Sequence, residues 1–329
     1  MSAEGLVQAL ENISPLEHSW LDRDVGPMED AALLRPESGP RLAFTVDFIT
    51  PIVDDPEAFG AIAAANSLSD VYAMGGDPQV ALALCGFPDD LLPPEVLTQI
   101  LRGGRDKAAE AGCAIVGGHT MIDPELKYGL CVIGSVPPER ALSQHHGQPG
   151  DRLVLTKPLG FGIAAQAIKN QALSPAELES AITAMSALNR GAKDAAIEAG
   201  ANAATDVTGF GLLGHLMNIA AASKLSAQIT ASDVPALGFA RRLAEAGVVP
   251  GGSKRNLEYV EPHTRFAAGV SQADRLVLAD AQTSGGLLIS VPPLREAQLC
   301  DALERNATLV QAVIGELTSG EPGTLSVER

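Results

Sequence analysis

The stretch Asp206-Val-Thr-Gly-Phe-Gly-Leu-Leu-Gly-His215 places a carboxylate before a glycine-spaced turn and an apolar helix. Its glycines allow backbone amides to approach an anion, and its leucines give the helix an apolar side. Asp206 stands on the entry side of the turn, where it could hold a hard cation against that anion. Taken alone, the pattern also suits an ordinary helix N-cap. Its interpretation therefore depends on the rest of the chain.

Three further aspartates occur in similarly constrained positions. Asp30 precedes a short apolar segment, and Asp47 closes the strand-like run 44–46. Asp70 lies near the end of an expected helix, one turn after Asn66 on the same face. An aspartate among core-facing apolar residues is costly unless it is paired or bound to metal. Each could be a turn or cap residue, but together they indicate Mg²⁺-dependent handling of a phosphate compound.

The composition limits the class of partner. The length of 329 residues favours two domains, and 46% hydrophobic residues with 33 Gly and 22 Pro favour a compact α/β protein. The net charge of −17 argues against nucleic acid or an anionic membrane as a partner. No apolar run approaches the ~20 residues that span a bilayer, and no basic-then-apolar leader is present. The four cysteines lack CxxC spacing, so we expect reduced thiols and a cytoplasmic location.

Periodicity and chain breakers predict alternating strands and helices. The polar, turn-rich segment 144–150 suggests a domain boundary, which gives domains 1–147 and 148–329. The expected helices cover 4–12, 56–74, 94–111, 160–170, 176–199 and 209–223. The expected strands cover 31–34, 42–46, 113–116, 128–136, 152–156, 286–291 and 310–316. The strand at 113–116 is expected to be buried.

Three glycine-rich segments could contact an anion. Gly117-Gly118-His119-Thr120 is predicted to be a loop that presents amides to phosphates after a buried strand. The segment 250–256 is interpreted as a turn with two cations, which suits an anion or an ordinary exposed loop. The segment 281–288 could be an amide nest, although a strand-initiating turn is slightly favoured. The histidines lack HxxxH spacing, which argues against a zinc site, and neither a G-x-x-x-x-G-K-[ST] loop nor GxSxG is present.

Several blocks in order resemble one known family. Together they closely resemble selenophosphate synthetase (selenide, water dikinase) from about residue 25 to 316. The blocks are specific as a set, although no single one would suffice. They are Thr45-Val-Asp47-Phe-Ile-Thr-Pro-Ile-Val-Asp54, Asn66-Ser-Leu-Ser-Asp70-Val-Tyr-Ala-Met-Gly-Gly76, Gly117-Gly-His-Thr120 with Asp123-Pro-Glu125, Thr205–His215 and Gln282-Thr-Ser-Gly-Gly286.

The resemblance implies a two-domain α+β (mixed α/β) fold of the aminoimidazole ribonucleotide synthetase superfamily. It also implies that two N-terminal domains pair in a homodimer with a β-barrel-like interface that holds the nucleotide. Unpaired strand edges in a lone N-terminal domain favour the same pairing. The implied reaction converts ATP, selenide and water to selenophosphate, AMP and orthophosphate, with Mg²⁺ and a potassium requirement.

Matching positions imply roles for individual residues. Asp30, Asp70 and Asp206 correspond to Mg²⁺ ligands. The nucleotide-contacting positions correspond to Pro27, Met28, Glu29, Asp47, Asn66, Asp70, Gly118, His119 and Thr120. Met28-Glu29 departs from the family, which usually has a polar residue and a second aspartate there.

The family's N-terminal loop, with a cysteine or selenocysteine nucleophile and a lysine three residues later, has no match here. The first cysteine is Cys85 and the first lysine is Lys107, so no catalytic residue is identified. We expect a truncated chain, and a paralogue without that chemistry is the other explanation. Two alternative functions stay open: another ATP-using enzyme of thiamine-phosphate kinase or aminoimidazole ribonucleotide synthetase type, and a nucleotide-binding, non-catalytic paralogue.

Overall fold

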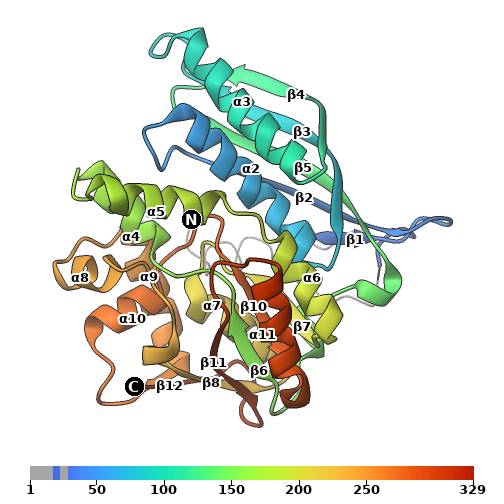
Figure 1. Ribbon diagram of the computed structural model, residues 1–329, viewed down its shortest axis with the longest axis vertical. Helices are drawn as coiled ribbons and strands as arrows, with labels where there is room; N and C mark the ends of the chain where they lie inside the picture. The colour runs from blue at the N-terminus through green and yellow to red at the C-terminus, as the bar shows by residue number, and fades with distance from the viewer. Residues whose placement is uncertain (1–17, 23–28) are drawn as a thin grey trace.

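The computed structural model describes residues 18–22 and 29–329, and its two β-sheets lie on either side of residue 147 (Figure 1). The first sheet has the order β1-β2-β5-β3-β4. Its neighbouring strands are antiparallel except for the parallel pair β3 and β4. The strands are β1 (Ala32–Leu34), β2 (Arg41–Ile49), β3 (Asp77–Phe87), β4 (Ala114–Ile122) and β5 (Lys127–Val136).

Two helices, α2 (Pro56–Ala73) and α3 (Pro94–Glu110), lie side by side over one face of this sheet (Figure 1). Helix α2 begins because Asp55 accepts a hydrogen bond from the Ala58 amide, 2.6 Å away, and a proline stands in its first turn. It ends before Gly75, whose φ of 78° is accessible to glycine. Most residues of α2 are buried, because the helix also contacts the second half of the protein.

The second sheet has the order β7-β10-β6-β11-β8-β12-β9. Strand β12 runs parallel to β8 and β9, and the other neighbours are antiparallel. The strands are β6 (Arg152–Leu155), β7 (Ala203–Asp206), β8 (Ser226–Thr230), β9 (Thr264–Phe266), β10 (Leu287–Val291), β11 (Ala312–Thr318) and β12 (Leu325–Glu328).

Helices pack around this second sheet, and short 3-10 turns connect several elements (Figure 1). The helices are α4 (Phe161–Lys169), α5 (Pro175–Ser186), α6 (Arg190–Ala199), α7 (Gly211–Ala222), α8 (Ala240–Glu245), α9 (Gly251–Val260), α10 (Gln272–Leu278) and α11 (Glu296–Arg305). The 3-10 turns are Pro138–Arg140, Gln144–His146, Ala231–Asp233, Glu261–His263 and Pro293–Arg295.

The mixed α/β class and two-sheet architecture confirm the expected fold, and the described part of this single chain contains no closed barrel. The expected helix 176–199 is wrong as one element, because residues between α5 and α6 interrupt it. The expected turn at 250–256 is also wrong, since α9 begins at Gly251. The expected helix 4–12 lies outside the described residues.

Candidate active site

Asp47 and Asp70 lie at the contact between β2 and α2. Thr45 and Asp47 stand on one face of β2, where side chains two residues apart point the same way. The Thr45 hydroxyl donates to the Asp70 carboxylate, and the Asn66 amide donates to that of Asp47. Ser67 donates to the Asp47 carbonyl oxygen at 2.9 Å. Strand and helix are thus joined through their polar side chains.

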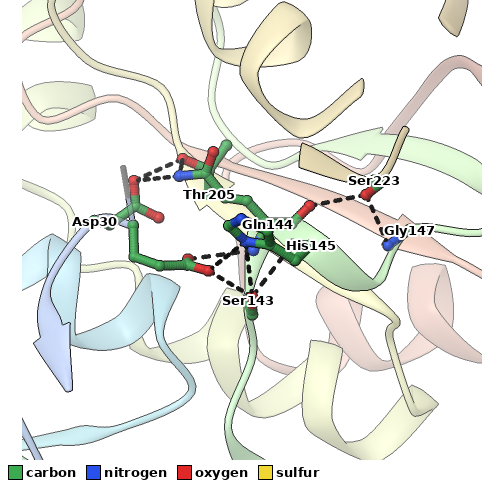
Figure 2. Close-up of polar contacts among 8 residues, drawn as sticks. Asp30, Ser143, Gln144, His145, Gly147, Thr205 and Ser223 are labelled. Atoms are coloured by element: carbon green, nitrogen blue, oxygen red, sulfur yellow. Dashed lines mark hydrogen bonds and ion pairs between the residues drawn. The ribbon is translucent and has the colours of Figure 1, made fainter. Parts of the chain in front are cut away.

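Asp30 and Asp206 come from opposite halves of the chain. Asp30 precedes β1, and Asp206 ends β7 with 1% exposure. Figure 2 shows that the hydroxyl of Thr205 reaches the Oδ1 atom of Asp30, at 2.8 Å. The other oxygen of Asp30 and the Oδ2 atom of Asp206 are buried without a hydrogen-bond partner in the described part of the chain.

These four carboxylates influence one another electrostatically. Burial raises the pKa of Asp30 and of Asp70 well above the ordinary value, and the charge of Asp206 raises both pKa values further. Burial raises the pKa of Asp206 to about 6; a hydrogen bond from Ser69 lowers this pKa and the charge of Asp47 raises it. Burial likewise raises the pKa of Asp47. The cluster therefore favours a bound cation, which removes the repulsion.

The donor set fits a cation that is only partly coordinated by protein. Among residues 18–22 and 29–329, no three His, Cys, Asp or Glu side chains form a ready metal cage. Mg²⁺ usually takes one or two carboxylates and completes its shell with water and substrate phosphates. The two buried, unpartnered carboxylate oxygens of Asp30 and Asp206 suit that mode, because such atoms are costly when left bare.

Glu29 is fixed next to Asp30 by the connection between the two sheets. Its carboxylate accepts from the Ser143 hydroxyl and lies 2.8 Å from the His145 Nδ1 atom. The backbone nitrogen of Gln144 donates to the same carboxylate at 3.2 Å. Pro27 and Met28 lie outside the described residues.

Gly118, His119 and Thr120 do not form the expected loop, and this prediction is wrong. They lie within β4, in register with β3, and are exposed. A Cβ at Gly118 would overlap the backbone of Ala83, so the glycine permits close strand pairing. Apart from Cys113, the expected buried strand 113–116 is likewise not buried. In the described chain, no hydrogen bond joins residues 118–120 to the four aspartates.

His119 instead contributes to a cavity on the open face of the first sheet. The cavity has a volume of about 350 Å³ and a largely apolar lining. It is lined by Phe48, Leu84, Cys85, Gly86, His119, Met121, Asp123 and Lys127. Phe48 follows Asp47 on β2, so the cavity and the carboxylates lie on opposite faces of this strand.

The segment 281–288 joins the two halves of the protein. The Ser284 amide donates to the Asn66 side-chain oxygen at 2.7 Å, and Asn189 donates to both Ser69 and the Gly285 carbonyl oxygen. The Gln282 side chain accepts from amides at the start of α4. The segment is therefore a turn, as favoured from the sequence, and its contact with Asn66 fixes it to helix α2.

Sequence reasoning missed a buried lysine beside this segment. Lys157 donates to the carbonyl oxygens of Ala187 and Ser284, both at 2.7 Å. Burial lowers its pKa to about 7, while the charge of Asp206 opposes that effect. A lysine two residues after the apolar strand β6 was the available signal. Gln144 was also missed, because it stands in a polar connection that suggested only a boundary.

The cysteines agree with the expectation of reduced thiols. All four are free, and burial raises the pKa of Cys113 to about 11 and that of Cys85 above its ordinary value. A raised pKa disfavours the thiolate, so neither side chain is an activated nucleophile.

Both halves of the chain match family models. Residues 28–136 match the N-terminal domain of AIR synthase related proteins, and residues 148–328 match their C-terminal domain. Solved structures of the same fold include thiamine monophosphate kinase from Aquifex aeolicus, with a TM-score of 0.67 and 18% identity over 98% of this chain and 94% of that one. The hydrogenase maturation protein HypE in complex with ATP has a TM-score of 0.66 and 21% identity over 93% and 86%. The chain is therefore an AIR synthase related protein.

Curated relatives narrow the class. The selenide, water dikinase of Myxococcus xanthus is 49% identical over 90% of this chain and 84% of that relative. The enzyme of the same name from Carboxydothermus hydrogenoformans is 43% identical over 100% of this chain and 95% of its own length. The chain belongs to the selenide, water dikinase family. The thiamine-phosphate kinase alternative is not favoured, since its resemblance is confined to the fold.

None of the helices in the described residues combines the length and the hydropathy that a membrane span requires.

Proposed function

We propose that this protein catalyses ATP-dependent formation of selenophosphate from selenide and water, with release of AMP and orthophosphate. Both phosphoanhydride bonds of ATP break in this reaction: one phosphorus gains a bond to selenium, and another gains an oxygen from water. The observation that carries the proposal is the meeting of buried, unpartnered carboxylate oxygens from both halves of a chain of this family. The activity is that of a kinase-type transferase.

Asp30 and Asp206 would hold Mg²⁺, with Asp70 close enough for the charges of both to raise its pKa. When bound, the metal neutralises phosphate charge, which supplies much of the catalysis in phosphoryl transfer. The protein's own part is positioning: Thr45 fixes Asp70, and Asn66 fixes Asp47. Glu29, Asp47 and Asn66 are proposed to contact the nucleotide. A potassium requirement completes the proposed ionic conditions.

The nucleotide site is proposed to lie where two copies of the N-terminal domain, residues 1–147, meet. The open face of the first sheet exposes apolar side chains that a second copy would cover. They are Phe44, Val46, Phe48, Leu82, Val116 and Met121. Gly118, His119 and Thr120 of β4 border this face and would contact the nucleotide there. The proposed assembly is a homodimer, and the proposed location is the cytoplasm.

Selenide-dependent product formation tests the activity. The full-length gene product is incubated with Mg·ATP and selenide, and the ³¹P NMR spectrum is followed. Selenophosphate and AMP should appear together, and AMP should depend on selenide. ADP as the sole nucleotide product, or phosphorylation of thiamine phosphate at ordinary rates, would contradict the proposal.

A further inference from the structure

The buried side chain of Gln144 bridges the two halves of the carboxylate site. Gln144 lies in the connection between the sheets and is 3% exposed. Its Nε2 atom is 3.2 Å from Asp30 Oδ1 and 3.4 Å from the Thr205 hydroxyl (Figure 2). Asp30 belongs to the first half of the chain and Thr205 to the second. One amide group therefore contacts both sides of the site.

The main chain of Gln144 is held as firmly as its side chain. Its amide nitrogen donates to Glu29 at 3.2 Å. Its carbonyl oxygen accepts from the Ser223 hydroxyl at 2.8 Å, and the same hydroxyl accepts from the Gly147 amide at 3.0 Å. Figure 2 shows this continuous set of contacts from Asp30 to the end of α7. The position of Nε2 is thus fixed by the fold.

The chemistry of the contacts determines the orientation of the amide. In the ionised, metal-binding form of Asp30, the reverse orientation would place the amide oxygen against the carboxylate, where neither atom can donate. With Nε2 facing the Thr205 oxygen, the hydroxyl hydrogen can point at Asp30 Oδ1, 2.8 Å away, which is nearer than its other acceptor, the Asp206 carbonyl oxygen at 3.2 Å. Oδ1 therefore accepts two hydrogen bonds, while Oδ2 is buried and has no partner in the described chain.

This asymmetry between two oxygens of one carboxylate matters for cation choice. Mg²⁺ demands near-ideal octahedral geometry, whereas Ca²⁺ accepts six to eight ligands and often takes both oxygens of a carboxylate. An Asp30 whose Oδ1 is occupied by donors can offer a metal one oxygen only. Outer hydrogen-bond partners of this kind orient the ligand and tune the metal.

We propose that Gln144 is a positioning residue that sets the cation preference of the site: with Thr205 it occupies one oxygen of Asp30 and so favours Mg²⁺ over Ca²⁺. The inference rests on the proposed function, because it takes Asp30 as a metal ligand. The connection between the two sheets, which carries Gln144, thereby gains a role in metal selectivity that the metal ligands themselves do not perform.

Competition for Mn²⁺ tests the inference without turnover. The whole chain is titrated with Mn²⁺ in the absence of nucleotide, free Mn²⁺ is followed by its EPR signal, and Mg²⁺ or Ca²⁺ is added as competitor. In the parent, Mg²⁺ should displace Mn²⁺ at lower concentration than Ca²⁺. In Gln144→Leu, the ratio of Mg²⁺ to Ca²⁺ affinity should fall about 10-fold, since loss of an outer partner commonly weakens binding by 10–100-fold.

Gln148→Leu is the matched control, because Gln148 is exposed in the same connection and its side chain reaches only the His146 carbonyl oxygen. Gln144→Glu is a second variant of nearly equal size, which lacks the N–H donors and should also lower the ratio. Thr205→Val should act on the same oxygen. Its effect combined with Gln144→Leu should be smaller than the product of the two, because the amide orients the hydroxyl.

An unchanged ratio in Gln144→Leu and Gln144→Glu would overturn the inference, as would an equal loss of both cations, which a general loosening of the fold would give. Failure of the parent to bind Mn²⁺ would overturn it too. The selenophosphate assay is separate: a chain that lacks turnover but shows the shifted ratio would retain this inference and lose the proposed activity.

Discussion

The side-chain amide of Asn66 donates a hydrogen bond to the carboxylate of Asp47, which lies 19 residues earlier in the chain. The oxygen of the same amide accepts from the backbone N–H of Ser284, 218 residues later. One buried side chain on α2 therefore sets the position of a site carboxylate and receives the turn that joins the two sheets. Asn66 therefore contributes both to the contact between the two halves of the protein and to the arrangement of the site.

Replacing Asn66 by leucine should destabilise the fold by about 2 kcal/mol, because the buried Ser284 amide loses its acceptor. Nucleotide binding should weaken as well, since Asp47 loses its donor. Urea unfolding measures the first effect and calorimetric titration with Mg·ATP the second. Asn170→Leu is the control, because Asn170 is exposed and pairs only with Gln166 through its side chain. Equal stability of Asn66→Leu and the parent would contradict the stabilising role assigned to the hydrogen bond between Asn66 and Ser284.

Asp206→Asn should bind Mg·ATP at least 10-fold more weakly while keeping the fold, because a charged ligand is lost. Without metal, the variant should melt at or above the parent's temperature, since a like charge beside Asp30 and Asp70 is removed. Mg·ATP should then raise its melting temperature less than it raises the parent's. Unfolding of the metal-free variant would identify Asp206 as a structural residue instead.

The stability of the metal-free protein should fall as the pH rises through about 6. The Asp206 pKa is raised from 3.8 to about 6, so the folded state binds this proton more tightly than the unfolded state. Its contribution is complete below pH 3.8 and is lost above about pH 6. Mg²⁺ affinity should change in the opposite sense, because the metal needs the ionised carboxylate. Melting curves in EDTA at pH 5, 6, 7 and 8 measure the difference in melting temperature between the parent and Asp206→Asn. A difference that does not change with pH would refute this role of Asp206.

Val116→Glu combined with Met121→Glu should convert the proposed dimer to a monomer. Val116 is 64% exposed and Met121 57% exposed on the open sheet face, so both changes are tolerated in a single chain but bury charges in a paired one. Light scattering at micromolar concentration measures the mass. Leu294→Glu is the control, since Leu294 is 97% exposed away from this sheet. A parent that is already monomeric and still binds ATP would count against the dimer.

Gly60→Ala should destabilise the protein, because the added Cβ would overlap the Ile100 carbonyl oxygen where α2 crosses α3. Overpacking of this kind costs about 1–3 kcal/mol. Gly252→Ala in α9 adds the same group where nothing lies within 4 Å, so it should be neutral or stabilise by up to about 1 kcal/mol. Chemical denaturation compares the pair, and equal effects would show that the helices can separate at little cost.

Local signals predicted the elements that depend on local interactions. Helix α2 was expected at 56–74 and spans Pro56–Ala73, because its cap, its first-turn proline and the following glycines all act within a few residues. The paired glycines near 117 misled, since they serve close strand contact as readily as a loop. The break between α5 and α6 was missed, and it contains Asn189, whose side chain bonds to Ser69, 120 residues earlier, a contact that no local pattern shows.

The sequence by itself determined the family and the aspartates that carry the proposed chemistry, because an ordered set of short motifs needs no coordinates to be recognised. Only the tertiary structure decided how those aspartates are held. The donors to Asp30 come from Gln144 and Thr205, which lie 114 and 175 residues later in the chain. Such contacts follow from the packing of two sheets against a shared helix. No local pattern encodes them, because the free energy that selects them comes from burying the whole interface.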